Sequence, residues 1–350
     1  MKKVCITLLG IVFSAFICVS QTQGKPYKIR TIAFYNLENL FDTINNPDKD
    51  DEISPIMEMK GNRSKAYKDK IKKLAKVISL IGSERAQNSP VIIGVAEVEN
   101  RSVLEDLIKS ESLRAKNYEI IHYDSPDKRG IDVALLYQSK YFKPIHHQVF
   151  DPRIYQDGYK VYTRDQLLVS GYLDDELIHI IVNHWPSRRG GEQKSRRLRE
   201  KSAYQNAKII EQLKEEEENP KLIIMGDFND DPINSSFKTV LKTKSQKQQL
   251  QKGDIYNPYE NMFSKGFNTL GYSDKINLFD QILMTSSLVD SGAKDFSSYK
   301  IFKAGIFNPS FLITQQGRYK GYPFRSFSNG RYTGGYSDHY PVYLYLIKEY

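Results

Sequence analysis

A series of short apolar runs, rich in β-branched residues, constrains the fold of this chain more than any other feature. Each run is too short for a typical helix and is bounded by charged or turn-forming residues, which is characteristic of buried strands. The chain should therefore build sheets with a large apolar interior. The predicted strands are Ile29 to Tyr35, Val91 to Val95, Ile131 to Tyr137, Leu177 to Val182, Leu222 to Met225, Leu278 to Met284 and Val342 to Ile347.

Helical patterns separate some of these runs. An apolar stripe from Ile71 to Ile81 predicts one helix, and Gln193 to Glu218 predicts a long charged helix that ends before Pro220. The break Asp174-Asp175-Glu176 predicts a hairpin, so the sheets are not purely parallel. We expect sheets covered by helices rather than a doubly wound nucleotide-binding fold, and no glycine-rich phosphate loop is present.

The N-terminus is typical of a secretory signal peptide. Lys2 and Lys3 precede an uncharged run from Val4 to Val19, so we expect a signal peptide over residues 1–22 and one domain over residues 23–350. The protein would then be periplasmic or secreted, with lipoprotein processing at Cys18 as the alternative. Both cysteines lie in the leader, which excludes disulfides, cysteine nucleophiles and thiolate zinc sites from the mature chain.

The net charge is compatible with an anionic substrate. The formal charge is +9, and removal of Lys2 and Lys3 leaves +7. Such a balance suits nucleic acid, lipid headgroups or simply a soluble surface, and it does not distinguish among them.

Polar residues recur where the predicted strands end or begin. A single such residue is most often a turn or a cap, but ionisable groups in buried strands are costly unless they are paired or bind metal. Their repetition in one order predicts a shared site. The set is Asn36 and Glu38, Glu97 and Glu99, Asp132, His184, Asp227 and Asn229, Asp280, and Asp338 with His339.

This ordered set resembles the endonuclease/exonuclease/phosphatase superfamily, which includes pancreatic-type deoxyribonucleases, abasic-site endonucleases, inositol-polyphosphate phosphatases and neutral sphingomyelinases. The resemblance runs from Tyr35 to Pro341 and is specific to the superfamily, not to a substrate. It implies a four-layer α/β sandwich in which two packed mixed sheets are flanked by helices. It also implies a metal-dependent phosphoesterase.

The resemblance carries roles to particular residues. Glu97 is the leading ligand of Mg²⁺, with Mn²⁺ as a substitute, and Asn36 and Asp338 assist, because hard cations prefer oxygen ligands. Whether Glu38 is a ligand, a supporting residue or a surface residue stays open. Asp227 is the expected proton acceptor and Asn229 orients phosphate or water, while His184 and His339 donate hydrogen bonds to the phosphate.

Two carboxylates are expected to hold the two histidines. The resemblance pairs Asp280 with His339 and Asp132 with His184, and such pairing would raise the imidazole pKa. Glu99 is expected to support the site or to act at the start of the helix before Val103. The remaining histidines, His122, His146, His147 and His179, are expected to be structural.

Arginine-rich segments are the candidates for substrate contacts. Arg129 either contacts phosphate or only pairs with Asp127. Arg188 and Arg189 would contact phosphate if the segment that follows His184, which also holds Lys194, Arg196 and Arg197, is not simply a solvated start of a helix. The segment 318–336 interleaves aromatic and basic residues and is either a stacking platform for single-stranded nucleic acid or an ordered loop packed on the sheet.

The sequence therefore predicts a monomeric, secreted phosphodiesterase that is most similar to nucleases and acts on DNA or RNA. A phosphomonoesterase, or an enzyme for sphingomyelin or inositol phosphates, is the enzymatic alternative. A catalytically inactive module that binds anionic polymers is the non-enzymatic alternative, although every residue expected of an active site is present.

Overall fold

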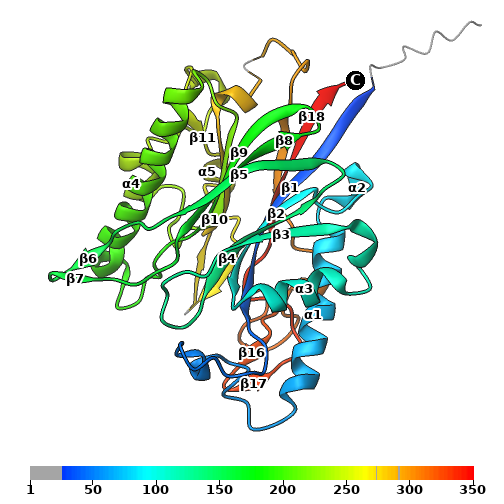
Figure 1. Ribbon diagram of the computed structural model, residues 1–350, viewed down its shortest axis with the longest axis vertical. Coiled ribbons are helices and arrows are strands. Elements are labelled where there is room, and N and C mark those ends of the chain that lie inside the picture. The colour runs from blue at the N-terminus through cyan, green and yellow to red at the C-terminus, as the bar shows by residue number, and fades with distance from the viewer. Residues whose placement is uncertain (1–25, 273, 291) are drawn as a thin grey trace, which may run out of the picture.

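Two six-stranded mixed sheets dominate the computed structural model, which describes residues 26–272, 274–290 and 292–350 (Figure 1). The expected signal peptide and both cysteines lie outside these residues. The first sheet has the order β15 (Lys300–Ile306), β18 (Val342–Glu349), β1 (Tyr27–Leu40), β2 (Ile92–Val98), β4 (Asp132–Gln138) and β3 (Tyr118–His122). The second has the order β11 (Ile255–Tyr256), β14 (Asp280–Thr285), β10 (Leu222–Asp227), β9 (Glu176–His184), β8 (Gln166–Leu173) and β5 (Phe142–Phe150).

The remaining elements are helices and small hairpins. The helices are α1 (Arg63–Leu80), α2 (Ser83–Ala86), α3 (Arg101–Lys109), α4 (Glu192–Glu216) and α5 (Tyr259–Phe263). Each hairpin is a two-stranded antiparallel ribbon: β6 (Tyr155–Gln156) with β7 (Tyr159–Lys160), β12 (Leu270–Tyr272) with β13 (Lys275–Asn277), and β16 (Phe327–Ser328) with β17 (Arg331–Tyr332).

The strands are apolar on both faces because each sheet is covered on both sides. In β1, Ile32 and Phe34 belong to the core between the sheets, whereas Ala33 and Tyr35 pack under α1 and α3. The second sheet repeats this arrangement, with one face against the first sheet and the other under α4. The fold is therefore a four-layer α/β sandwich, and Figure 1 shows α1 and α3 on one side with α4 on the other.

The elements agree with the pattern of the sequence. All the predicted strands are present, the long charged helix spans Glu192–Glu216, and the turn after Leu173 joins β8 to β9 as a hairpin. Pairing is parallel for β1 with β2 and for β9 with β10, and it is antiparallel for their outer neighbours, which confirms mixed sheets. Across residues 26–272, 274–290 and 292–350, no helix has the length and apolar character that crossing a membrane requires.

Candidate active site

Three polar residues form a row across the second sheet. In β10, Asp227 lies opposite His184 of the parallel strand β9 and opposite Asp280 of the antiparallel strand β14. All three side chains are buried. The strand register alone therefore gathers an imidazole and two carboxylates at one end of the sandwich.

The first sheet contributes Asn36 and Glu97 to the same end. The register of β1 with β2 shifts between Asn36 and Leu40, and that of β2 with β4 shifts between Ala96 and Val98. Within these irregular strand ends Glu97 has a φ of 58°, a left-handed conformation that is uncommon for a residue with a side chain. The shift turns the Glu97 carboxylate toward β1, where the Asn39 amide donates to its Oε2 at 2.9 Å.

Asn36 connects the carboxylates of the two sheets. Its amide nitrogen donates to Glu97 Oε1 at 3.1 Å and to Asp227 Oδ2 at 3.0 Å. Its side-chain oxygen accepts a hydrogen bond from the Glu38 backbone amide at 2.9 Å. In this geometry Asn36 positions the two carboxylates, and its side-chain oxygen, which has two lone pairs, accepts one hydrogen bond.

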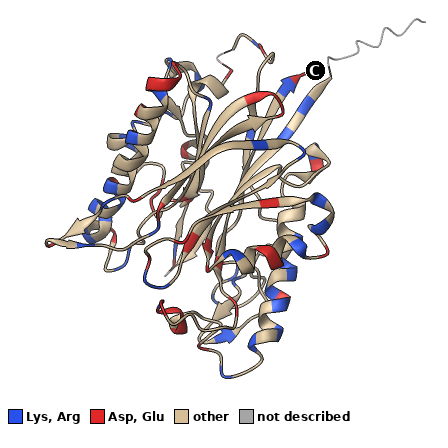
Figure 2. Ribbon diagram, viewed as in Figure 1, with Lys and Arg blue, Asp and Glu red and all other residues tan. Residues whose placement is uncertain are grey.

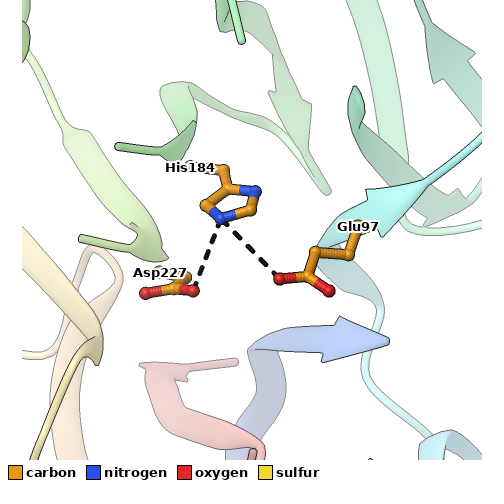
Figure 3. A group of neighbouring side chains, drawn as sticks. All are labelled: Glu97, His184 and Asp227. Carbon is orange, nitrogen blue, oxygen red and sulfur yellow. Dashed lines mark ion pairs between the residues drawn. The ribbon is translucent and has the colours of Figure 1, made fainter. Parts of the chain in front are cut away.

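Figure 3 shows Glu97, His184 and Asp227 converging on one point. His184 Nε2 lies 3.6 Å from Asp227 Oδ2 and 3.9 Å from Glu97 Oε1. The side chain of Glu97 is 18% exposed, whereas those of His184 and Asp227 are almost fully buried. Solvent therefore reaches the cluster on the side of Glu97.

His339 forms the expected pair with Asp280. Its Nδ1 lies 2.7 Å from Asp280 Oδ2, and its Nε2 lies 3.9 Å from Asp227 Oδ2. Burial lowers the pKa of His339, but Asp280 and Asp227 more than reverse this, so the pKa lies well above its usual range. His339 is accordingly a cation that presents Nε2 toward Asp227.

Asp227 has an unusual protonation equilibrium. Burial raises its pKa to about 7, with Asp280 and Glu97 adding to the rise while His339 opposes it. The Asn229 amide donates to Asp227 Oδ1 at 3.0 Å, and Asn229 has a φ of 50°. The Asn229 side-chain nitrogen donates to the Trp185 carbonyl at 3.0 Å, which fixes this residue against the end of β9.

The expected pair of Asp132 with His184 does not form. Asp132 Oδ2 lies 3.0 Å from His122 Nε2, and its Oδ1 accepts from the Ser125 amide, because β4 pairs with β3 and brings His122 alongside. His122 is thus the structural partner of Asp132. Among the described residues His184 Nδ1 has no hydrogen-bond partner.

His184 is also not the cation that was expected. Burial lowers its pKa well below the usual range, and the charges of Arg164, Arg129 and His339 lower it further. Because Nδ1 faces no acceptor, the single proton of the neutral ring belongs on Nε2, which faces two carboxylates. The site therefore holds one neutral and one charged histidine.

Glu38 lies beside the cluster but faces away from it. Its carboxylate accepts hydrogen bonds from the Ser326 and Phe327 backbone amides, and Lys70 donates to its backbone carbonyl at 2.8 Å. Burial raises its pKa to about 7. Glu38 thus anchors the segment 325–327 to the end of β1, and Arg325 Nε lies 3.5 Å from its Oε1.

Asp338 and Glu99 also have partners other than a metal. Asp338 Oδ2 lies 3.0 Å from Arg325 Nη2, and the Asp338 side chain is 27% exposed. Glu99 accepts from the Asp42 amide at 2.7 Å. The helix cap expected of Glu99 is supplied by the next residue, since the Asn100 side chain accepts from Val103.

The arginines chosen as phosphate contacts differ in their surroundings. Arg129 pairs with Asp127 at 3.3 Å. Arg188 is occupied within the protein, because it donates to the Asn229 carbonyl at 2.9 Å and to Asp231 at 3.1 Å and covers the ring of Phe279. Arg188 therefore stabilises the loop after β10, whereas Arg189 is exposed and the side chain of Arg129 is 43% exposed beside Asp127.

Several residues that support the site could not be found from sequence. Arg164 is buried and donates to the carbonyls of His184 and Trp185, and Arg199 is buried against Asp230 at 2.6 Å. Lys70 is buried as well, and burial lowers its pKa to about 8. Each lies in an otherwise ordinary helix or loop, and its only signal is its contact with a distant segment.

The cluster is chemically suited to a hard divalent cation. Glu97 and Asp227 each present a carboxylate oxygen, and these oxygens and a ring nitrogen of His184 lie within 4.8 Å of one another. Two neighbouring carboxylates, one of them with a pKa raised to about 7, form a site where positive charge is favourable. With Nε2 of His184 protonated, the free ligand atoms are carboxylate oxygens, which oxygen-preferring cations favour.

Comparison with known proteins agrees with this geometry. No curated protein sequence matches the chain. Humanized D. rerio TDP2 has a similar structure at 14% identity and a TM-score of 0.54, with 91% of this chain and 99% of that chain covered. An endonuclease/exonuclease/phosphatase family protein from Bacteroides thetaiotaomicron is similar at 16% identity and a TM-score of 0.54, covering 93% of this chain and 99% of that chain.

A mannosyl-6-phosphatase of Bacteroides thetaiotaomicron is also similar, at 17% identity and a TM-score of 0.51, with 91% of this chain and 99% of that chain covered. At such identities the likeness concerns the fold. The sequence model of the Endonuclease/Exonuclease/phosphatase family matches residues 31–348, and the chain belongs to this family of phosphoesterases.

Proposed function

We propose that this protein hydrolyses phosphate esters with the help of Mg²⁺, which Mn²⁺ can replace. The observation that carries the proposal is the convergence of Glu97 and Asp227, from different sheets, on the neutral His184, with the charged His339 also near Asp227. A purely structural ion-pair network would not require two carboxylates to face each other at a partly open edge.

Glu97 is the residue that we propose to hold the cation, and Asp227 is close enough to contribute a second carboxylate. When bound, such a cation neutralises negative charge on the phosphate and on the leaving oxygen. Asn36 keeps both carboxylates in place through its amide nitrogen. Asp338 Oδ2 is paired with Arg325, so its Oδ1 is the atom that would serve as a further oxygen ligand.

The remaining residues handle protons and the phosphate. Asp227 accepts the proton of the attacking water, and Asn229 fixes the Asp227 carboxylate through its backbone amide. His339 and His184 donate hydrogen bonds to phosphate oxygens through Nε2, the former as a cation. Asp280 orients His339 from behind, at 2.7 Å.

The test is hydrolysis of a panel of esters by the purified protein in Mg²⁺, Mn²⁺, Zn²⁺ or chelator. The panel contains plasmid DNA, RNA, sphingomyelin, inositol phosphates, sugar phosphates and an aryl phosphodiester. Hydrolysis of at least one ester in Mg²⁺ or Mn²⁺, abolished by chelator, supports the proposal. Failure on every ester would leave the inactive binding module as the better description.

Nuclease-like action on DNA or RNA is the more specific candidate from the sequence. Its support is the exposed basic start of α4, where Arg189, Lys194 and Arg197 reach solvent, and Figure 2 shows basic residues along this helix. D. rerio TDP2, which has a similar fold, was solved with single strand DNA product. Arg188 was expected to contact phosphate, but it binds groups within the protein, so it does not support the nuclease candidate.

A phosphomonoesterase is the other candidate within the family. One protein of similar structure is named a mannosyl-6-phosphatase, that is, an enzyme that acts on a sugar phosphate. A cavity beside Asp338 is lined by aromatic rings and carboxylates, and this lining favours a phosphomonoesterase.

We further propose that residues 1–22 direct export and that residues 23–350 function as one monomeric domain. The support is the charge pattern of Lys2, Lys3 and the apolar run after them. Fractionation of cells that express the full chain, with N-terminal sequencing of the product, tests the cleavage.

A further inference from the structure

A cavity of about 710 Å³ opens beside the site, within the size range of small-molecule pockets, about 300–1,000 Å³. It adjoins the site through two residues that line it. Asn39 donates its backbone amide to Glu97, and Asp338 precedes His339. A phosphate held at Glu97 and His339 would therefore direct the rest of its ester toward this cavity.

The far wall of the cavity is a rigid part of the protein. Segment 312–324 folds back on itself through the hydrogen bonds of Thr314 to Tyr322, Gly321 to Thr314 and Phe324 to Leu312. It overlaps segment 318–336, which the sequence left open between a stacking platform and an ordered loop, and its rings of Tyr319, Tyr322 and Phe324 line the cavity. The wall is in place before a ligand arrives, which lowers the entropic cost of binding.

Aromatic rings line the cavity and remain accessible. Tyr272 is 69% exposed and Tyr319 is 52% exposed, and the rings of Tyr319 and Tyr322 lie 5.8 Å apart. Gly271 packs directly on Tyr322, since a Cβ there would come within 2.5 Å of the ring. Glycine at this position thus lets the β12–β13 hairpin close against the aromatic wall.

The charges of the lining argue against a second phosphate. Apart from the buried Glu38, the carboxylates of Glu58, Asp274 and Asp338 outnumber the guanidinium groups of Arg318 and Arg325. Arg318 lies 2.9 Å from Asp274, and Arg325 lies 3.0 Å from Asp338. Both cations are already paired, so a nucleotide polymer, which carries phosphates on both sides of each sugar, would meet net negative charge here.

We propose that this cavity binds a neutral, polyhydroxylated ring, either a sugar or a cyclitol, which is the leaving alcohol of the phosphate ester. Aromatic faces cover the apolar side of such a ring, while carboxylate and amide oxygens accept from its hydroxyl groups. The proposal rests on the phosphoesterase function proposed above. Water would release the free polyol and inorganic phosphate from the ester.

The first test compares esters that differ only in the hydroxyl groups of the leaving ring. We expect kcat/KM for myo-inositol 1-phosphate or a hexose 6-phosphate to exceed that for cyclohexyl phosphate by at least about tenfold, because sites built for hydroxyl groups reject analogues without them. Equal values for these esters would overturn the proposal. A higher kcat/KM for oligonucleotides than for every polyol phosphate would overturn it as well.

A variant tests whether the preference arises in this cavity. Tyr319→Ala should lower the ratio of polyol to cyclohexyl activity by at least about fivefold, chiefly through KM, because the ring is half exposed and contributes stacking area. The matched control is Tyr204→Ala on α4, where the side chain is 58% exposed, and its ratio should equal that of the wild type. An unchanged ratio in Tyr319→Ala would place the preference elsewhere and overturn the assignment.

Binding without turnover separates this proposal from the proposed function. Saturation-transfer NMR with free myo-inositol, glucose or mannose in chelator should show contact in the wild type and a reduced signal in Tyr319→Ala. Loss of hydrolysis with retained polyol binding would refute only the enzymatic role. Hydrolysis of aryl esters with no polyol binding at millimolar concentration would refute only the cavity assignment.

Discussion

Asp227 and Asp280 lie directly opposite each other on β10 and β14, and His339 presents one ring nitrogen to each of them. Two buried carboxylates at adjacent strand positions would repel each other strongly without a cation between them. The histidine supplies that cation, and the same contacts raise its pKa well above the usual range. A register contact between two strands thus favours the protonated form of His339, the group that we propose to contact the phosphate.

The first prediction concerns this pair. His339→Ala and Asp280→Asn should each lower kcat by at least about 10²-fold, and the double variant should be little worse than the worse single, because the residues act as one unit. Asp280→Asn should also move the alkaline limit of the pH–rate profile to lower pH, since the His339 pKa falls without its partner. Additive losses with an unchanged profile would make Asp280 a structural residue only.

A second prediction separates the two carboxylates that were expected to hold histidines. Asp132 contacts His122 and the Ser125 amide, not His184. Asp132→Asn should therefore destabilise the protein by about 1–3 kcal/mol, the usual cost of disturbing a buried hydrogen-bonded group. Its kcat should stay within about twofold of wild type, unlike that of Asp280→Asn. Thermal unfolding and steady-state rates check both expectations.

The difference between these two pairs illustrates what the sequence can predict. The strands were predictable because every apolar run is covered on both faces, and their ends showed which polar residues to consider. The family resemblance assigned Asp280 to His339, and in the structure the register places Asp280 opposite Asp227. Asp132 begins β4 beside β3, and a sequence without known register could not show that His122 lies alongside.

For the same reason, the sequence could not predict which residues support the site through contacts with distant segments. Arg164 precedes β8 and contacts the end of β9, and Lys70 of α1 contacts segment 326. In the sequence they are unremarkable basic residues among many. Their burial is the informative property, and burial of a single long cationic side chain depends on the tertiary fold.

A third prediction concerns the cation. Glu97→Gln should raise the Mg²⁺ concentration for half-maximal activity by at least about tenfold, because it removes a ligand charge at the open side of the cluster. Glu105→Gln, at an exposed ion pair on α3, is the matched control and should titrate like the wild type. Excess chelator should abolish activity, and Zn²⁺ alone should not restore it. Identical Mg²⁺ titrations for Glu97→Gln and wild type would exclude Glu97 as a ligand.

A fourth prediction follows from the raised pKa of Asp227. With a pKa of about 7 in the folded protein against 3.8 for a free aspartate side chain, the folded state binds this proton more tightly than the unfolded state. Its contribution to stability is complete at low pH and is lost as pH rises through about 7. In chelator above pH 7, Asp227→Asn should therefore stabilise the protein, on the order of 1–3 kcal/mol.

The same variant should lose activity by at least about 10²-fold, because asparagine cannot accept the proton of water. Thermal unfolding at pH 5 and pH 8 measures the effect on stability, and the gain should appear only at the higher pH. A variant that is less stable than wild type at both values would show that the charged carboxylate stabilises the fold.

The last prediction distinguishes two neighbouring arginines. Arg188 holds the Asn229 carbonyl and Asp231, whereas Arg189 is exposed. Arg188→Ala should lower kcat for every substrate, including a small aryl phosphodiester, and should lower the melting temperature, because it loosens the loop that carries Asn229.

Arg189→Ala should keep the small-substrate rate within about twofold of wild type. If the protein cleaves nucleic acid, Arg189→Ala should reduce the slope of log KM against log salt by about one, the contribution of a single phosphate contact. Equal losses on small and polymeric substrates in Arg189→Ala would instead assign Arg189 to the pocket of the reacting phosphate.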